Sequence, residues 1–259
     1  MAASADASGL SPGLARLWGF DRGSRPGQRP SLDIRQIAAA GIAVADEGGL
    51  AAVSMSRVAK ALGVTTMALY RYVESKDELL ELMLDVAAGD PPGLDPAMSW
   101  REALRVWAQT LAELFLARPW LVDVRLPGPP RGPHQLAWAE QGMAVLRDTG
   151  LTPDERLGVI MALLVHVRGE AGLLSQLAAS SSGGVAETDD AYYAFMSALP
   201  ADRFPNFAAM GSPDDEVAAS AGSPAVSPAG PTDAGPWFGL ELLLDGVEQC
   251  VRARESAAP

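Results

Sequence analysis

The sequence contains one cysteine and two histidines among its 259 residues. A single cysteine, Cys250, cannot form a disulfide within the chain or build a cysteine-based zinc site, and it suits a reducing cytoplasm. The sequence also lacks a nucleophile elbow, a phosphate-binding glycine loop and a His-x-x-x-His pair. We therefore expect no enzymatic activity, no cofactor and no metal site.

A leader and a long apolar run are missing too. The N-terminus has no basic segment followed by an apolar core, so we expect no secretory signal. The longest apolar run, Leu157 to Val165, is much shorter than a membrane span, so we expect no membrane partner. These absences favour a cytoplasmic protein.

Basic side chains are outnumbered, and the formal net charge is −12. Their distribution is uneven, because residues 16–76 carry nine basic and five acidic side chains while the remainder is strongly acidic. A basic head on an acidic body suits contact with phosphates at one end only. A chance local excess explains the same numbers.

Apolar residues recur only at helical spacing, which predicts an all-α fold. One inward-facing stripe comprises Ile34, Ile37, Ala38, Gly41, Ile42 and Ala45. Capping boxes begin at Ser75, Ser99 and Thr152. The expected helices span residues 32–47 (with Ser31 as N-cap), 54–62, 65–73, 75 onward, 99–117, 134–148, 152–179 and 237–254. The 152–179 helix is apolar nearly all round, which predicts a central position.

Two segments rich in Ala, Ser, Gly and Pro lack such periodicity. We expect residues 1–30 and 211–236 to be disordered. The first contains a basic stretch, residues 16–29, which is either a mobile arm that lies along DNA or a tail without function.

The stretch from Val53 to Leu82 predicts a helix-turn-helix. Two short helices flank Gly63, a residue type that tolerates a left-handed turn. The second, residues 65–73, is too short to be stable alone and polar on its outer face. In this motif the second helix enters a DNA major groove.

The order of Leu62-Gly63-Val64, then LYRYV at 69–73 and SKDELL at 75–80, resembles the tetracycline-repressor (TetR) family of transcriptional regulators. The resemblance is strong over residues 31–86 and weaker beyond, where LARPW at 116–120 carries it. It implies a helix-turn-helix DNA-binding domain of three helices at 31–78 and a larger helical ligand-binding and dimerisation domain at 79–259. It also implies a homodimeric repressor that an unknown small molecule releases from a palindromic operator in double-stranded DNA. The alternatives are a helical partner-binding protein that has lost DNA binding and, less favoured, an enzyme.

The candidate DNA contacts lie on and around the second helix of the motif. They are Ser54, Ser56, Arg57, Thr65, Thr66, Met67, Ala68, Tyr70, Arg71, Tyr72 and Lys76. Threonine, methionine and alanine suit thymine methyls or base edges, and arginine suits guanine or phosphate. The resemblance places Tyr70 and Tyr72 facing DNA and Lys76 on a phosphate, whereas Thr65 could cap the helix and Tyr72 could pack on the 32–47 helix. Leu69 and Val73 are expected in the core.

The candidate ligand contacts are less specific. They are Trp107, Trp120, Trp138, His166, Arg168 and Glu170. The tryptophans are equally compatible with simple core packing, and His166 with Glu170 could form an internal pair or a salt bridge across a dimer. The resemblance implies no tetracycline–magnesium site, because the family's metal-ligand positions are apolar here. Ser56 replaces a guanine-reading arginine of the tetracycline repressor, so a different operator is expected.

Overall fold

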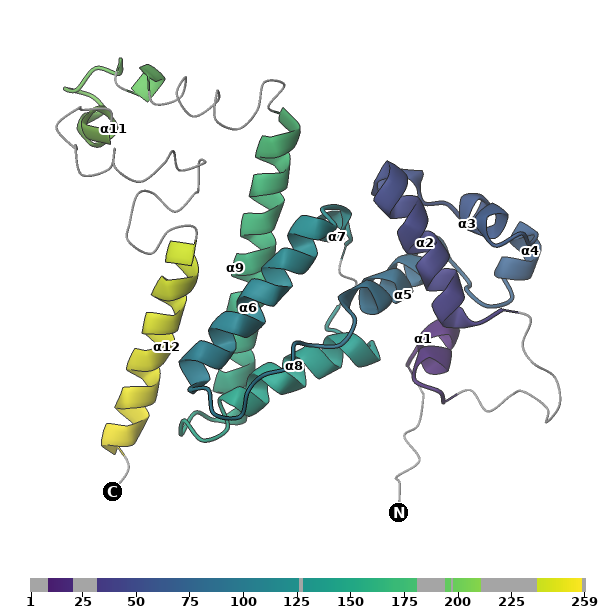
Figure 1. The fold of residues 1–259 in the computed structure, drawn as a ribbon, viewed down its shortest axis with the longest axis horizontal. Helices are drawn as coiled ribbons and strands as arrows, with labels where there is room; N and C mark the ends of the chain where they lie inside the picture. The colour runs from purple at the N-terminus through teal and green to yellow at the C-terminus, as the bar shows by residue number, and fades with distance from the viewer. Residues whose placement is uncertain are drawn as a thin grey trace. The chain divides into compact units, whose positions relative to one another are not determined.

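The computed structural model describes residues 9–20, 32–125, 128–180, 194–196, 198–210 and 237–257, and all regular elements within them are helices (Figure 1). This confirms the all-α class. The helices are α1 Pro12–Leu17, α2 Ile34–Gly48, the 3-10 turn η1 Leu50–Ala52, α3 Met55–Ala61, α4 Thr66–Leu69, α5 Lys76–Ala88, α6 Trp100–Ala117, α7 Trp120–Asp123, α8 Pro133–Val145, α9 Pro153–Ser180, α11 Pro205–Met210 and α12 Phe238–Ala257. The 211–236 segment lies outside the described residues.

The chain divides into two compact units, residues 1–161 and 162–259, and the division falls inside α9. It differs from the functional boundary after residue 78 that the sequence suggests. The reason is that α5, the helix following the motif, packs on α8 and is hydrogen-bonded to it. The boundary at residue 78 therefore remains a functional proposal.

The α2 helix supplies the core of the segment that the resemblance assigns to DNA binding, residues 31–78. We call this segment the DNA-binding head. All six residues of the expected apolar stripe on α2 are buried. The expected start was wrong, because the helix begins at Ile34 with Asp33 as its N-cap. Asp33 and Gln36 form a reciprocal capping box, which satisfies two backbone N–H groups. Gly49, with φ of +71°, ends the helix as expected.

The helix-turn-helix consists of α3 and α4. Gly63 has φ of +68° at the turn, the conformation for which glycine is suited. The expected helix over 65–73 is shorter than predicted, since α4 ends at Leu69. Residues 70–72 continue as a tight turn, in which the Arg71 and Tyr72 amides donate to carbonyls three residues earlier. We call residues 65–72 the reading segment.

The α1 helix corrects the expectation that residues 1–30 are disordered. Ser11 caps it, Pro12 occupies the favourable first turn, and Leu14 and Leu17 are 0% and 5% exposed. It packs on α2 and α5 (Figure 1). Residues 1–8 and 21–31 lie outside the described part of the chain, so the arm over 22–29 stays a prediction.

The later turns of α5 and the residues that follow it are joined by polar contacts to α8 and to Arg131 just before α8. Arg131 forms an ion pair with Glu81 at 2.9 Å, and Trp138 Nε1 donates to the Gly89 carbonyl at 3.1 Å. Gln141 Nε2 donates to the Pro92 carbonyl at 2.7 Å. We call this set of contacts, with the Asp85 cap described below, the α5–α8 ladder.

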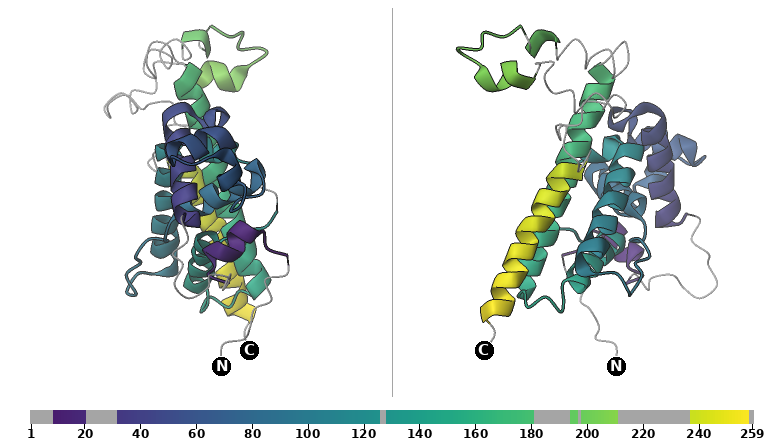
Figure 2. Two further views of the ribbon diagram at one scale, coloured as in Figure 1. Left: turned by 90° about the vertical axis from the view of Figure 1, so that its right-hand side faces the viewer. Right: turned by 60° about the vertical axis from the view of Figure 1, so that its left-hand side comes forward.

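The α9 helix corrects the expectation of a central, buried position. Only 28% of the most apolar window of α9 is buried inside the chain, so α9 does not lie in the centre of the core. By length and composition this helix could also cross a membrane. Exposed apolar residues follow one i,i+4 row along it, comprising Leu157, Met161, Val165, Leu173 and Leu177. Within the second unit, α12 begins beside the middle of α9, where Gly239 abuts the His166 ring (Figure 2).

Candidate nucleic-acid interface

The reading segment presents its side chains outward over a buried base. Met67 is 76% exposed and Tyr70 is 44% exposed, and Arg71 also lies on the surface. Leu69 and Val73 are completely buried, as the sequence predicts. A helix this short is not stable by itself. The buried side chains of Leu69 and Val73 hold it at the surface.

Two hydroxyl side chains cap the helices of the motif. Thr65 Oγ1 accepts the Ala68 amide at 3.2 Å and Ser54 Oγ accepts the Arg57 amide at 3.3 Å. A capping hydroxyl keeps its own proton for donation, so the cap at Thr65 is compatible with a DNA contact. The Oγ atoms of Ser54 and Ser56 lie 3.2 Å apart, which places both hydroxyls at the start of α3.

Exposed basic groups flank the reading segment. Lys76 is the first residue of α5, where unpaired backbone amides favour an anion. Arg57 lies exposed on α3, and its guanidinium reaches the Ala52 carbonyl at 3.4 Å, a weak contact. Both positions suit contacts with phosphates rather than with bases.

Tyr72 differs from Tyr70 in being half-buried. The Arg16 guanidinium lies 5.7 Å from the centre of the Tyr72 ring and donates to the Tyr72 carbonyl at 2.8 Å. The tyrosine therefore contacts α1. From the sequence, only packing on the 32–47 helix was considered as a contact within the chain. Thr66 and Ala68 are also partly exposed, and α4, which carries them, packs on α3, where Ser56 and Arg57 lie.

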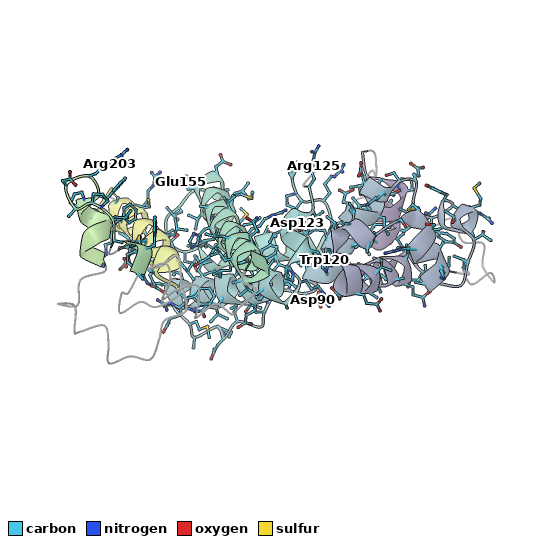
Figure 3. The ribbon with its side chains drawn as sticks, turned by 90° about the horizontal axis from the view of Figure 1, so that it is seen from above. Asp90, Trp120, Asp123, Arg125, Glu155 and Arg203 are labelled. Atoms are coloured by element: carbon cyan, nitrogen blue, oxygen red, sulfur yellow. The ribbon has the colours of Figure 1, made fainter. Side chains whose placement is uncertain are left out.

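The three candidate tryptophans use their indole N–H groups inside the chain. Trp107 Nε1 donates to the Trp138 carbonyl at 3.1 Å, and the two rings meet edge to face at 5.5 Å. Trp138 donates to the backbone after α5, and Trp120, which is labelled in Figure 3, donates from Nε1 to Asp46 Oδ1 at 2.7 Å. They are 2%, 6% and 5% exposed for Trp107, Trp138 and Trp120. Their proposed contact with a ligand remains a prediction.

His166 and Glu170 lie one turn apart on α9, as their spacing predicts. Nε2 of His166 is 3.4 Å from Oε2 of Glu170, within ion-pair distance, yet among the described residues it has no partner with hydrogen-bond geometry. Burial raises the pKa of Glu170, and the neighbouring His166 opposes that rise. Arg168, between them in sequence, is half-buried.

Sequence reasoning missed the carboxylate that caps α8. Asp85 is fully buried, and its oxygens accept hydrogen bonds from His134 Nδ1 at 2.8 Å and the Gln135 amide at 2.9 Å. Gly132, the residue before α8, has no side chain to cap that helix, and a Cβ there would lie 2.0 Å from Asp85 Oδ1. The N-cap of α8 is thus supplied by α5. A charged residue on the apolar face of α5 was the available signal.

Asp46 is a second missed residue. Near the end of α2, its carboxylate accepts from Trp120 and forms an ion pair with Arg118 at 3.3 Å. The RPW portion of the LARPW motif therefore binds the DNA-binding head. The end of α2 and the residues around the start of α7 are consequently held together.

An exposed helix-turn-helix over a buried base, joined to a larger helical segment, defines a DNA-binding transcriptional regulator. The family description "Bacterial regulatory proteins, tetR family" matches residues 37–83, and "Tetracyclin repressor-like, C-terminal domain" matches residues 92–251. The chain belongs to the TetR family of bacterial regulatory proteins, as the sequence resemblance predicted.

Two proteins from Streptomyces species are similar over most of the chain. The chain is 33% identical to the HTH-type transcriptional repressor DrrR1 of Streptomyces coeruleorubidus, over 93% of this chain and 86% of that protein. It is similar to apo ActR from Streptomyces coelicolor, with a TM-score of 0.67, 26% identity and coverage of 89% of this chain and 100% of that one. ActR in complex with actinorhodin matches with a TM-score of 0.67 and 25% identity, over 87% and 97% of the two chains.

Proposed function

We propose that this chain is a cytoplasmic, homodimeric repressor that binds a near-palindromic operator and is released by a small organic molecule. The outward presentation of the reading segment carries the DNA-binding half of this proposal. Met67, Tyr70 and Arg71 project from a buried base, and Lys76 lies beside them. We assign base contacts to Thr66, Met67, Tyr70 and Arg71, and phosphate contacts to Arg57 and Lys76.

The exposed apolar row on α9 supports a homodimer. Val165 at its centre is 66% exposed, and Leu242 on α12 is 55% exposed. Apolar surface of this kind is costly in water unless another surface covers it, and an i,i+4 row is the ridge that packs into the groove of a second helix. A two-fold copy of the same face satisfies both requirements. The two reading segments would then meet successive major grooves, roughly 34–36 Å apart.

The α5–α8 ladder supports a route from a ligand to the DNA. The α5 helix begins at Lys76, beside the reading segment, and its later turns are bonded to α8 through Asp85 and Glu81. A ligand that moves α8 therefore moves α5 with it. Release follows if the ligand binds the displaced arrangement more tightly than the DNA-competent one.

An organic effector is proposed from ActR, whose structures hold actinorhodin in one case and (S)-DNPA in another. In this chain His166 and Glu170 are the most suitable polar contacts, because Nε2 of His166 is buried and has no hydrogen-bond partner in the part of the chain that the structure describes. Such an atom can accept a hydrogen bond from a ligand hydroxyl, or donate one, according to its tautomer. The tryptophans are better suited to shaping the fold around the ligand.

Selection of bound duplexes from a random pool tests the proposal. The wild-type protein is expected to enrich a near-palindrome with two half-sites about one helical turn apart. Screening of small organic molecules for release from that duplex then identifies the effector. Enrichment of no sequence, with equal retention of all duplexes, would refute the operator assignment.

A further inference from the structure

The α1 helix lies outside both segments that match the family descriptions, which begin at residues 37 and 92. We propose that α1 is an additional element of the DNA-binding head and that Arg16 is a positioning residue, which fixes the reading segment through Tyr72. This inference rests on the proposed role of residues 65–72 in reading DNA. It assigns no base or phosphate contact to Arg16 itself.

The seat of α1 on α5 is specific. The Gly13 amide donates to Glu78 Oε1 at 2.6 Å, while the other oxygen of that carboxylate accepts the Glu74 amide at 2.5 Å. In the capping box expected at Ser75, the Glu78 carboxylate would accept the Ser75 amide. Instead it accepts the amides of Gly13 and Glu74, and so joins α1 to the turn before α5. A Cβ on Gly13 would lie 2.8 Å from both Glu78 Oε1 and Leu82 Cδ1, so only glycine fits without displacement.

Arg16 contacts Tyr72 in two ways. Its NH1 donates to the Tyr72 carbonyl at 2.8 Å, and its guanidinium lies 5.7 Å from the ring centre. The planar guanidinium can donate and stack at once, whereas a lysine ammonium cannot reproduce that geometry. The carbonyl belongs to the residue that ends the tight turn after α4. Arg16 therefore limits both the backbone and the ring at the end of the reading segment.

The far end of α1 is anchored as well. Trp18 Nε1 donates to the Arg131 carbonyl at 2.8 Å, and Arg131 NH1 donates to the Gly9 carbonyl at 3.2 Å. Arg131 also forms the ion pair with Glu81 of α5. The helix that carries Arg16 is consequently held on both sides, which is the arrangement that positioning requires.

The test compares operator binding of wild type, Arg16→Ala, Arg16→Lys and Gly13→Ala by fluorescence anisotropy at several salt concentrations. The loss of one hydrogen bond to a charged group predicts about tenfold weaker operator binding for Arg16→Ala. Arg16→Lys should not restore it, and Gly13→Ala should weaken binding with no change of charge. Arg147→Ala, an exposed charge at the end of α8, serves as the control and should leave binding unchanged.

Two readouts separate positioning from a direct phosphate contact. Positioning predicts that the slope of log affinity against log salt stays at the wild-type value in Arg16→Ala and that lysine does not rescue binding. A direct contact predicts a slope smaller by about 0.9 and rescue by lysine. The second pattern would overturn the inference, as would unchanged operator affinity in Arg16→Ala.

Urea unfolding confirms that each variant is folded under the binding conditions, and Gly13→Ala provides an independent route if Arg16→Ala is unstable. Wild-type protein in the same assay separates the two proposals. If wild type prefers no duplex, the proposed operator function fails. If wild type binds its operator and the α1 variants bind equally well, only the role of α1 is wrong.

Discussion

Trp120, at the start of α7, donates its indole hydrogen to Asp46, near the end of α2 in the DNA-binding head. The distance from Nε1 to Oδ1 is 2.7 Å. The same carboxylate pairs with Arg118, and Pro119 between the two donors sets the turn that lets both reach it. The contact is part of the structural link between the helix-turn-helix and the helices that follow.

Trp120→Phe keeps an aromatic six-membered ring and removes the indole N–H together with the smaller ring. We expect the free energy of unfolding to fall by at least about 1–2 kcal/mol, the usual contribution of a hydrogen bond to a charged acceptor, with a further loss for the missing ring volume. Urea denaturation followed by circular dichroism measures this change. Trp100→Phe makes the same chemical change at the start of α6 and serves as the control. Equal, negligible effects of both would show that the Asp46 contact contributes nothing.

Asp85→Ala removes the cap of α8. We expect a loss of about 3 kcal/mol in unfolding free energy, because the change leaves the Gln135 amide and the His134 ring without their buried acceptor. The exposed carboxylate of Asp148 provides the matched control in Asp148→Ala. A loss below 1 kcal/mol in Asp85→Ala would contradict the assignment of the cap.

The carboxyl group of Glu170 predicts a pH dependence. Burial raises its pKa above the ordinary value of 4.5, so the folded state binds its proton more tightly than the unfolded state. Its contribution to stability is therefore fully present below pH 4.5 and is lost as the pH rises through the folded-state pKa. Glu170→Gln should remove that decline and be more stable than wild type at neutral pH.

Urea denaturation across this pH range tests the sign. Glu255→Gln, an exposed carboxylate near the end of α12, is the control and should follow the wild-type curve. Stability of wild type that rises with pH by an amount dependent on Glu170 would contradict the predicted direction.

Val165→Glu tests the dimer face. A carboxylate in the middle of the exposed row on α9 would be buried without a partner in a dimer, so we expect dissociation constants at least tenfold larger. Sedimentation velocity at micromolar concentrations measures the shift from dimer to monomer. Ala97→Glu adds the same charge in the exposed segment before α6 and should leave the association unchanged. A dimer unaffected by both changes would place the interface elsewhere.

The sequence was sufficient for elements whose signals are local. The α2 stripe, the Gly63 turn and the Ser99 and Thr152 capping boxes involve residues within a few positions of one another, and all are present. The Asp33–Gln36 box was a local signal as well, overlooked in favour of Ser31. The α4 helix ends where the tight turn of residues 70–72 begins. Apolar periodicity does not distinguish so short a turn from a further turn of helix.

Contacts between distant segments could not be predicted. The α1 helix is short and lies in a Gly- and Pro-rich context, and its stability comes from burying Leu14 and Leu17 on helices far away in sequence. The Asp85 cap joins residues 50 positions apart, and no local pattern marks its partner. The exposure of α9 could not be predicted from the sequence either, because an apolar helix is equally typical of a core and of an association surface.

Lys76→Ala separates phosphate contact from sequence reading. An exposed lysine at the start of α5 should contribute equally to every duplex, so its removal should weaken operator and scrambled DNA by the same factor. The slope of log affinity against log salt should decrease by about 0.9 for the one phosphate lost. A selective loss on the operator alone would assign Lys76 to base reading instead.

The most direct test of the reading segment is the ratio of affinities for the selected operator and for a scrambled duplex, measured in wild type and in Arg71→Ala at matched salt. We predict that this ratio falls by about tenfold or more in the variant, because an arginine contact to a base edge is lost while phosphate contacts remain. An unchanged ratio, or a wild-type protein that binds both duplexes equally, would contradict the account.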